Sequence, residues 1–341
     1  MTAEVLSTHT PELFRRAVRR ASELLRAGEA VALPTETVYG LAANALDAAA
    51  VAKIFQIKGR PANNPIIVHV ASREMAGSCV TDWSPLAERL ARSFWPGPLT
   101  LVLPRAQDIP AAVTAGGDTV GVRWPGHPFI QAVIRACGFP LAAPSANLSG
   151  RISPTNAEHV RRQLGGQIPL IVDGGQSQVG IESAVLDLTV APPRVLRPGM
   201  IHAESLAAVC GQVQSLEFRV ESSAGKWVGA IPSPGLLKKH YSPRARLLVL
   251  SWGNDTDLAA QLTSRRLPPV SCFVIAHTNI PSGEKFGGVT VIPHDAEAFA
   301  RALYGELHRC DAAGAAAIVM ETPPTSPEWA GIADRLRRAA A

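Results

Sequence analysis

The stretch GEAVALPTETVYG, at residues 28–40, joins a short apolar run to a polar segment. Residues 30–33 have the length of a buried strand, and residues 34–40 then carry two threonines and a glutamate. A helix is predicted before this stretch, over residues 10–27, because a threonine and a proline suit its start and Gly28 suits its end. Polar side chains that leave a buried strand predict contacts with a small polar ligand, and capping of a following helix is the alternative.

Short apolar runs alternate with helical patterns from there to residue 211. We therefore predict an α/β domain over residues 10–211, built on an open, twisted sheet with helices packed against it. The last strands follow each other closely, which favours a mixed sheet over an all-parallel one. The predicted strands are residues 30–33, 66–70, 99–103, 120–123, 141–143, 170–172, 184–188 and 194–196. The predicted helices are residues 10–27, 47–57, 84–94, 127–137, 155–164 and 202–210.

A long linker and a second α/β unit follow. Residues 212–244 lose the periodicity and are rich in glycine and proline, and a connection of that length predicts a functional segment. Its last part, residues 233–243, carries two lysines with His240 and Tyr241. This composition predicts a lid, a segment that closes on top of a bound ligand. Residues 245–341 predict a small Rossmann-like domain with a parallel sheet. Its predicted strands are residues 247–251, 270–276, 289–292 and 316–320, and its predicted helices are residues 255–262, 296–310 and 327–338.

The composition is that of a globular chain. Of its 341 residues, 47% are hydrophobic and 18% are charged, which excludes a disordered chain. Five scattered cysteines without a C-x-x-C pair exclude a disulfide-stapled miniature and a zinc site of the usual spacing. No apolar run reaches the roughly 20 residues of a membrane span and no signal peptide is visible, so we expect a soluble, cytoplasmic protein with no membrane partner. A net charge of +5 suits a polyanionic ligand such as a nucleotide.

The common signatures of phosphate-binding and hydrolytic enzymes are missing from the sequence, including the P-loop, the H-E-x-x-H zinc motif and the G-x-S-x-G elbow. Polar, glycine-rich segments instead follow several predicted strands. Residues 58–65 place a lysine, an arginine and two asparagines in one turn, which suits a phosphate group. Residues 143–154 carry three serines and an asparagine, whose small side chains leave backbone amides open to a phosphate.

Seven short segments, taken in order, resemble the motifs of one known family. They are P-T-E-T-V-Y-G at residues 34–40, K-G-R-P-x-x-N-P at 58–65, P-G-P-L-T at 96–100, V-R-x-P-x-H-P at 122–128, S-A-N-x-S-G at 145–150, D-G-G-x-x-x-x-G-x-E-S at 173–183 and L-R-P-G at 196–199. The chain resembles the YrdC-like family. With K-H-Y-S-P at residues 239–243 and the C-terminal unit, it looks like the long, two-domain form of that family, the L-threonylcarbamoyladenylate synthases. The resemblance covers residues 10–338 and departs from the usual pattern at Ile152, Ala184 and residues 236–237.

This resemblance implies an enzyme that joins L-threonine, bicarbonate and ATP into threonylcarbamoyl-AMP and releases pyrophosphate. A downstream threonylcarbamoyl transferase complex would pass the group to the adenosine next to the anticodon of tRNA, so the first reaction would not require tRNA. A carbamate oxygen would attack the α-phosphorus without a protein nucleophile, and catalysis would rest on positioning and on the charges of Lys58 and Arg60. Magnesium would enter on the ATP phosphates, with no metal ligand from protein side chains.

The same resemblance assigns two groups of residues to the substrates. For L-threonine they are Thr37, His69, Arg123, the backbone at Ala143, and Ser183. For ATP they are Lys58, Arg60, Asn64, Thr119, Ser145, Ser153, Arg197, His240 and Tyr241. Arg123 suits the substrate carboxylate, because a guanidinium can form a two-pronged, charge-assisted contact with it.

The sequence alone leaves two other functions open. A basic α/β surface can hold RNA backbone, as in an RNA-binding or ribosome-associated module of YrdC-like fold, although aromatic residues make up only 5% of the chain and form no cluster of the RNP type. A carbamoyl-transfer unit of hydrogenase maturation would sit among zinc fingers and an acylphosphatase-like segment, and this sequence has neither. Plainer alternatives are a structural histidine at position 69 and surface ion pairs for Arg123 and Arg197.

Overall fold

The structure, a computed structural model, describes residues 2–215, 233–234 and 240–341. The chain divides into two compact units. The first unit comprises Met1–Ser149, Pro154–Gln178 and Glu182–Leu236, and the second comprises Gly150–Ser153, Val179–Ile181 and Leu237–Ala341. Two short segments, Gly150–Ser153 and Val179–Ile181, are flanked in sequence by the first unit and yet belong to the second. Residues 216–232 of the predicted linker and residues 235–239 of the predicted lid lie outside the described residues.

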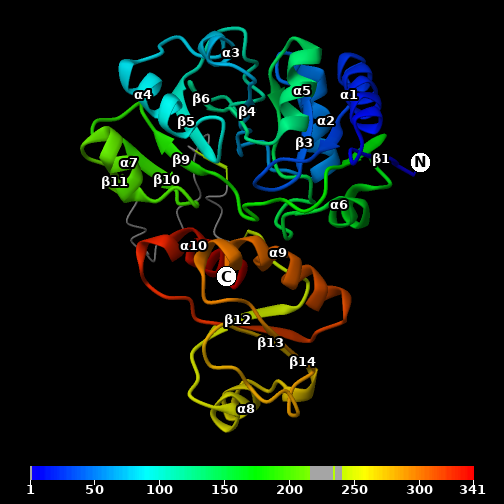
Figure 1. Cartoon of the computed structure of the whole chain (residues 1–341), viewed down its shortest axis with the longest axis vertical. Helices are drawn as coiled ribbons and strands as arrows, with labels where there is room; N and C mark the ends of the chain where they lie inside the picture. Colours follow the sequence, from blue (N-terminus) through cyan, green and yellow to red (C-terminus); the bar gives the residue numbers. More distant parts are fainter. Residues whose placement is uncertain (1, 216–232, 235–239) are drawn as a thin grey trace. The chain divides into compact units, whose positions relative to one another are not determined.

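The first unit is built on one eleven-stranded sheet (Figure 1). The strand order is β1-β8-β2-β3-β7-β4-β6-β5-β9-β10-β11. Strand β6 is parallel to β4 and antiparallel to β5, and both kinds of pairing recur across the sheet, which confirms the predicted mixed sheet. The strands are β1 (Glu4–Ser7), β2 (Val31–Leu33), β3 (Gly40–Asn44), β4 (Val68–His69), β5 (Leu99–Pro104), β6 (Thr119–Arg123), β7 (Leu141–Ala142), β8 (Leu170–Asp173), β9 (Ala184–Asp187), β10 (Arg194–Arg197) and β11 (Gln214–Ser215).

Seven helices accompany this sheet among the described residues of the first unit, and six of them were predicted. The helices are α1 (Pro11–Arg26), α2 (Ala48–Lys58), α3 (Arg73–Ser78), α4 (Pro85–Phe94), α5 (Pro128–Cys137), α6 (Ala157–Leu164) and α7 (Ala203–Cys210). Capping residues explain why the ends of most of these helices could be predicted from the sequence. The hydroxyl of Thr10 accepts a hydrogen bond from the backbone of Leu13, and a carboxylate oxygen of Asp47 does the same for Ala49 and Ala50.

Helices α1 and α5 lie side by side and share one apolar core (Figure 1). On α1 the buried residues include Ala17, Ala21 and Leu25, which lie on one face of the helix. The ring of Phe129 on α5 meets Phe14 edge-on, with ring centroids 5.2 Å apart. Burial of each large side chain in such a core contributes about 1.5–3 kcal/mol. A second core cluster includes Val51 of α2 and Leu90 of α4.

The sequence analysis missed strands β1, β3 and β11 and helix α3. Strand β1 pairs in parallel with β8, with Glu4 opposite Leu170, so its pairing partner lies far away along the chain. Strand β3 pairs antiparallel with β2, with Leu33 opposite Gly40. It is buried along almost its whole length and therefore lacks the alternating pattern that marks a half-exposed strand.

The second unit has one four-stranded sheet in the order β12-β15-β13-β14. Every pairing in it is parallel, which confirms the predicted Rossmann-like unit. Its core includes Leu258 and Leu262 of α8 together with Val274 and Val319 of the sheet. The strands are β12 (Arg246–Leu250), β13 (Cys272–Ala276), β14 (Gly288–Val291) and β15 (Ala317–Glu321). The helices are α8 (Asp255–Ser264), α9 (Ala296–Ala312) and α10 (Ala330–Ala339), with short 3-10 turns at Pro269–Ser271 and Pro327–Trp329.

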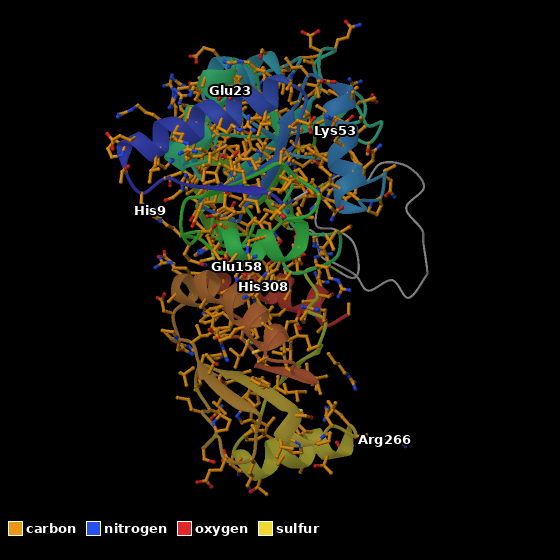
Figure 2. All side chains as sticks on the ribbon, turned by 90° about the vertical axis from the view of Figure 1, so that its right-hand side faces the viewer. His9, Glu23, Lys53, Glu158, Arg266 and His308 are labelled. Atoms are coloured by element: carbon orange, nitrogen blue, oxygen red, sulfur yellow. The ribbon has the colours of Figure 1, made fainter. Side chains whose placement is uncertain are left out.

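Charged side chains gather on the outside of the helices. Lys53 on α2 pairs with Glu29, and Glu158 on α6 pairs with its neighbours Arg161 and Arg162; Lys53 and Glu158 are labelled in Figure 2. Exposed pairs of this kind contribute little to stability, about 0–1 kcal/mol each. Among the described residues, no helix combines the length and the apolar character needed to cross a lipid bilayer.

Gly199, in the L-R-P-G segment after β10, offers a test of packing in the first unit. A Cβ atom at this position would lie 2.4 Å from the backbone nitrogen of Ala184 and 2.9 Å from its Cα, and backbone cannot easily move aside. We expect Gly199→Ala to lower the free energy of unfolding by about 1–3 kcal/mol or more, measured by denaturant unfolding. Gly77→Ala in α3 is the matched control, because no atom lies within 4 Å of its added Cβ. Equal unfolding midpoints for the two variants would contradict this packing.

Candidate functional site

The strand register of the sheet centre brings two of the predicted threonine residues together. Strands β4 and β6 are parallel neighbours, and His69 stands directly opposite Arg123. On its other side His69 stands opposite Leu141 of β7, and the predicted contact Ala143 follows two residues later. Because His69 and Arg123 end their strands at the same edge, the segments that leave this edge converge there.

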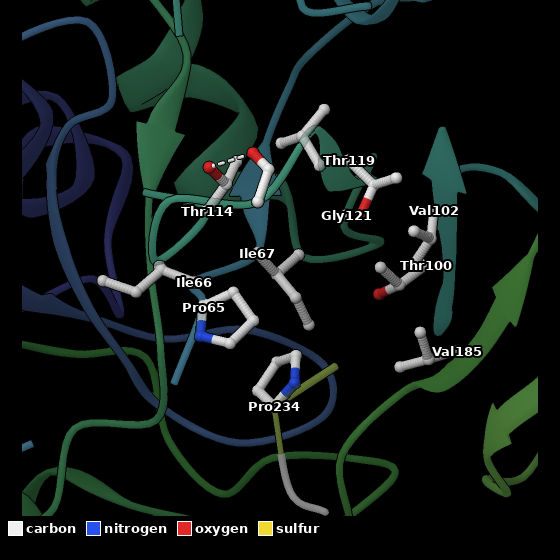
Figure 3. Close-up of a pocket in the computed structure, with 12 residues that line it drawn as sticks. Pro65, Ile66, Ile67, Thr100, Val102, Thr114, Thr119, Gly121, Val185 and Pro234 are labelled. Carbon is white, nitrogen blue, oxygen red and sulfur yellow. Dashed lines mark hydrogen bonds between the residues drawn. The ribbon is translucent and has the colours of Figure 1, made fainter. Parts of the chain in front are cut away.

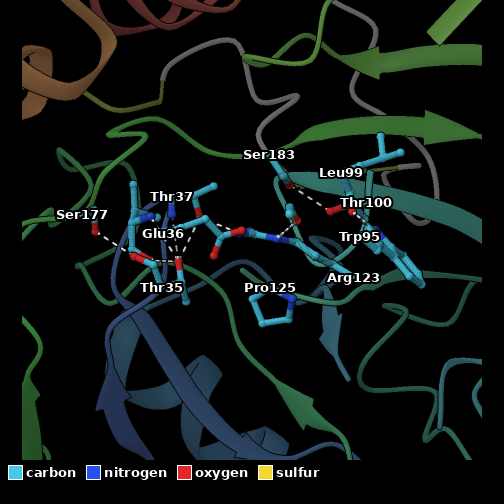
Figure 4. A network of polar contacts seen from close by, with 12 residues as sticks. Thr35, Glu36, Thr37, Trp95, Leu99, Thr100, Arg123, Pro125, Ser177 and Ser183 are labelled. Atoms are coloured by element: carbon cyan, nitrogen blue, oxygen red, sulfur yellow. Dashed lines mark hydrogen bonds and ion pairs between the residues drawn. The ribbon is translucent and has the colours of Figure 1, made fainter. Parts of the chain in front are cut away.

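Arg123 is the centre of a buried polar network (Figure 4). The residue is 4% exposed, and its Nη2 donates to Oε1 of Glu36 at 2.6 Å and to the hydroxyl of Thr37 at 3.0 Å. Its Nε donates to the carbonyl of Gly97 at 3.2 Å, which ties it to the P-G-P-L-T segment. These three contacts hold the guanidinium in one orientation before any substrate arrives.

A tight turn after β2 points Thr37 at this guanidinium. The hydroxyl of Thr35 accepts hydrogen bonds from the backbone of Thr37 and Val38, at 3.2 and 3.3 Å. The same hydroxyl lies 2.9 Å from the hydroxyl of Thr37. Hydroxyl-to-backbone bonds of this kind form a compact turn, so the alternative of helix capping for this segment does not apply.

Glu36 is a residue of this network that the sequence analysis did not assign. Burial alone would raise the pKa of its carboxyl, but Arg123 and the backbone of Gly126 outweigh burial and hold that pKa below its usual value. One carboxylate oxygen binds Arg123, and the other, Oε2, is buried without a hydrogen-bond partner among the described residues. The sequence showed a carboxylate in this segment, but not which of its three polar side chains would face Arg123.

His69 is neutral in this environment. Burial, and next the positive charge of Arg123, lower the pKa of its imidazole to about 3. Its Nδ1 lies 3.4 Å from the carbonyl of Ile67, so we assign the ring proton to Nδ1. That assignment leaves Nε2 as a hydrogen-bond acceptor, suited to a hydroxyl group.

Ser183 and Arg197 form a second group across strands β5, β9 and β10. The hydroxyl of Ser183 lies 2.8 Å from the hydroxyl of Thr100 and accepts a hydrogen bond from Nη2 of Arg197 at 3.2 Å. Nε of Arg197 donates to the backbone carbonyl of Ser183 at 3.0 Å, and its Nη1 donates to the carbonyl of Pro234 at 3.2 Å. A residue predicted for threonine and one predicted for ATP are therefore in direct contact.

The end of α2 brings the K-G-R-P-x-x-N-P segment to the S-A-N-x-S-G segment. The helix ends at Gly59, whose φ of 58° is left-handed and suits glycine. Nζ of Lys58 donates to the carbonyls of Ser145 and Asn147, both at 2.5 Å. Burial, and next the charge of Arg60, hold the pKa of the Lys58 amine well below its usual value.

Arg60 folds back on its own loop. Its Nη2 donates to Oδ1 of Asn64 at 2.7 Å and to the carbonyl of Pro65 at 2.6 Å, and its Nε donates to the carbonyl of Asn64 at 3.0 Å. The side chains of Lys58 and Arg60 and two polar loops therefore lie within one compact region. Such a cluster of donors is what a chain of phosphates requires.

A cavity of about 200 Å³ lies on this unit between strands β5, β6 and β9 (Figure 3). Of the predicted ATP residues, only Thr119 lines it, at the start of β6. Pro234, which the sequence analysis placed in the lid, also lines this cavity. Its other walls are mostly apolar, and they consist of Pro65, Ile66, Ile67, Thr100, Val102, Thr114, Gly117, Val120, Gly121 and Val185.

Three predicted ATP residues, Ser153, His240 and Tyr241, lie in the second unit. The ring of Tyr241 is fully buried, stacks on Tyr304 with centroids 6.0 Å apart and lies under the guanidinium of Arg335 at 5.5 Å. The ring of His240 meets the ring of Tyr241 edge-on, with ring centroids 3.9 Å apart. The structure thus places these residues within the second unit, and their contact with ATP stays a prediction.

Two family models match this chain. A model described as "Telomere recombination" matches residues 23–199, and a model described as "Threonylcarbamoyl-AMP synthase, C-terminal domain" matches residues 201–341. Together they cover the described parts of the functional site in the first unit and the whole of the second sheet.

Curated relatives carry one name. The chain is 40% identical to the threonylcarbamoyl-AMP synthase of Pyrococcus abyssi over 94% of this chain and 93% of that protein. It is 45% identical to the threonylcarbamoyl-AMP synthase of Bacillus subtilis over 72% of this chain and 68% of that protein. These names do not favour the RNA-binding module.

A solved structure matches the fold over the whole chain. The crystal structure of P. abyssi Sua5 complexed with L-threonine aligns with a TM-score of 0.87 and 36% sequence identity, and the match covers 100% of this chain and 98% of that one. Fold, motifs and both family models agree along the chain. The protein therefore belongs to the threonylcarbamoyl-AMP synthase family, in the form that carries both the domain of residues 23–199 and the C-terminal domain of residues 201–341.

Proposed function

We propose that this chain joins L-threonine, bicarbonate and ATP into threonylcarbamoyl-AMP and releases pyrophosphate. The observation that carries the proposal is the buried, pre-oriented guanidinium of Arg123 beside neutral His69. A guanidinium binds a carboxylate, and a neutral imidazole nitrogen accepts a hydrogen bond from a hydroxyl. L-threonine carries both of these groups, and the L-threonine complex of P. abyssi Sua5 supports the assignment.

The nucleotide would lie on the same unit. Lys58, Arg60 and the segment at Ser145 supply cations and small polar groups suited to the phosphates. The mostly apolar cavity lined by Thr119 and Pro234 suits a flat base, with the Thr119 hydroxyl as a polar contact. Arg197 contacts Ser183 on one side and the Pro234 carbonyl on the other, and so joins the two substrate regions.

The reaction needs positioning more than side-chain chemistry. The amine of threonine takes up bicarbonate with loss of water and becomes a carbamate. A carbamate oxygen then attacks the α-phosphorus of ATP, and pyrophosphate leaves. Arg60 and Lys58 would stabilise the charge on the transferring phosphoryl group, and the fixed network around Arg123 would hold the attacking molecule in place.

We propose further that magnesium enters on the ATP phosphates. Mg²⁺ keeps several waters and commonly binds through substrate phosphates. The side chains at the proposed phosphate region are cations, hydroxyls and an amide, which fit phosphate oxygens and leave the metal to phosphate and water. When bound, magnesium would neutralise phosphate charge. Across the described parts of the chain, no group of three or more His, Cys, Asp or Glu side chains is arranged to hold a metal ion.

The product is a mixed anhydride, so its consumer must be a group-transfer enzyme. We propose a downstream threonylcarbamoyl transferase complex that modifies the adenosine next to the anticodon of tRNA. We place the reaction in the cytoplasm, because ATP and the tRNA acceptor meet there.

Pyrophosphate release tests the reaction. We expect release from ATP to require both L-threonine and bicarbonate and to proceed without tRNA, because the attacking carbamate forms only when both are present. The measurement is a coupled pyrophosphate assay with each component omitted in turn. ATP turnover that ignores threonine, or RNA binding without turnover, would contradict the proposed function.

Removal of the central guanidinium should affect one substrate. We expect Arg123→Ala to weaken L-threonine binding by about 2–5 kcal/mol, since it removes one half of a desolvated charge pair, while ATP binding changes far less. Calorimetric titration of each ligand measures both effects. Arg162→Ala, on the exposed side of α6, is the control and should change neither affinity. Equal losses for both ligands in Arg123→Ala would mean that Arg123 supports the fold or the nucleotide.

The pH dependence of threonine binding tests the state of His69. With a pKa of about 3, below the ordinary 6.5, the imidazole gains a proton only when the pH falls towards 3 and is neutral above pH 5. We therefore expect the affinity for L-threonine to stay constant between pH 5.5 and 7.5, about a hundredfold range of proton concentration. Isothermal titration across this range measures it. A loss of affinity centred near pH 6.5 would show that His69 titrates normally and has another role.

A further inference from the structure

The threonine region of the first unit contains a balanced pair of charges. Arg123 is buried, and so is Glu36, whose Oε1 accepts the 2.6 Å hydrogen bond from the guanidinium. The other predicted threonine contacts, Thr37, Ser183 and the backbone at Ala143, are uncharged, and His69 is neutral. The charges that act on the His69 imidazole are those of Arg123 and Glu36. Arg123 and Glu36 therefore form a pair with zero net charge, and the next cation, Arg197, is bound to Ser183 and to the carbonyl of Pro234.

A buried ion pair with zero net charge selects its ligand by charge. A simple carboxylate beside Arg123 would add one negative charge that the Arg123–Glu36 pair does not compensate, and burial of an uncompensated charge is strongly unfavourable. A zwitterionic amino acid adds one charge of each sign, so its carboxylate can face Arg123 while its ammonium faces the negative end of the pair. The net charge of the pair and the ligand together stays at zero when such a ligand binds.

One carboxylate oxygen of Glu36 can still interact with a positive charge. Its Oε1 is taken by Arg123, while Oε2 is buried and has no hydrogen-bond partner among the described residues. A nearby cation stabilises a buried carboxylate oxygen that has no hydrogen-bond partner. At low dielectric this attraction acts over several ångströms without direct contact. Gly126 lies beside this carboxyl, since a Cβ atom on it would be 3.5 Å from the carboxyl carbon of Glu36 and 3.6 Å from Oε1.

We propose that Glu36 is the residue that makes this site specific for an amino acid with a free ammonium group over carboxylic acids that lack one. This inference rests on the proposed function and deepens it, because it names the feature of threonine that Glu36 selects. Arg123 attracts any carboxylate, and the negative charge of Glu36 restricts that attraction to zwitterions. The site thereby admits only molecules that possess the amine on which a carbamate can form.

The test compares two ligands on two proteins. The ligands are L-threonine and 2,3-dihydroxybutanoate of matching configuration, in which a hydroxyl replaces the ammonium. The proteins are the unsubstituted chain and its Glu36→Gln variant, which keeps the size of the side chain and removes its charge. We expect the unsubstituted chain to prefer threonine by about a hundredfold or more in calorimetric titration. In Glu36→Gln we expect threonine to bind about tenfold or more weakly and the hydroxy acid to bind more tightly, so that the preference largely disappears.

Two further variants separate charge from shape. Glu36→Asp keeps the negative charge and should keep the preference for threonine, even where both affinities fall. Glu158→Gln removes an exposed carboxylate on α6 and should leave both affinities unchanged. If Glu36→Gln weakened both ligands by the same factor, Glu36 would only position Arg123 and the inference would be overturned. If Glu36→Gln did not fold, as judged by thermal unfolding, the Glu36→Asp result and the comparison of ligands on the unsubstituted chain would decide.

Binding measurements on the unsubstituted protein distinguish a failure of this inference from a failure of the proposed function. Binding of threonine and of the hydroxy acid with equal affinity would overturn the role of Glu36 and leave the proposed function intact. Absence of threonine binding would overturn the proposed function itself, and the role of Glu36 with it.

Discussion

The buried ion pair between Arg123 and Glu36 constrains the rest of the first unit. A guanidinium that is almost completely removed from water needs a counter-charge and hydrogen-bond acceptors, and Glu36, Thr37 and Gly97 supply them. Loss of either charged partner would leave the other buried and uncompensated, which costs about 3–5 kcal/mol. The turn after β2, the P-G-P-L-T segment and the end of β6 are therefore held in one arrangement by the group that we propose for the substrate carboxylate.

Sheet register explains how distant motifs come to share this place. Parallel pairing of β4 with β6 sets His69 opposite Arg123, and antiparallel pairing of β4 with β7 brings the segment after Leu141 alongside. Strand β9 is parallel to β5, with Ala184 opposite Leu99, so Ser183 reaches Thr100. Four motifs that are separated by tens of residues thus meet because their strands end at neighbouring points of one sheet.

The proposed reaction, which uses no protein nucleophile, matches the character of these residues. The described contacts at the site join arginines, a lysine, hydroxyls and backbone carbonyls, all held by hydrogen bonds before a substrate is present. Groups fixed in advance need little reorganisation when charge develops in the transition state. The chain belongs to the threonylcarbamoyl-AMP synthase family, and this arrangement of charges supports the chemistry that we propose.

Most of the helices and most of the candidate residues of this protein could be predicted from the sequence alone. Helix α1 could be predicted from Thr10, Pro11 and Gly28, since the signals that begin and end a helix are local properties. The motif segments, and through their resemblance the family, were also visible in sequence. Only the tertiary structure decided that β1 pairs with β8, that Glu36 takes Arg123 as its partner, and that Pro234 and Thr119 line one cavity. These facts depend on which strands become neighbours and which side chains lose water together. Such long-range packing leaves no periodic trace in a single sequence.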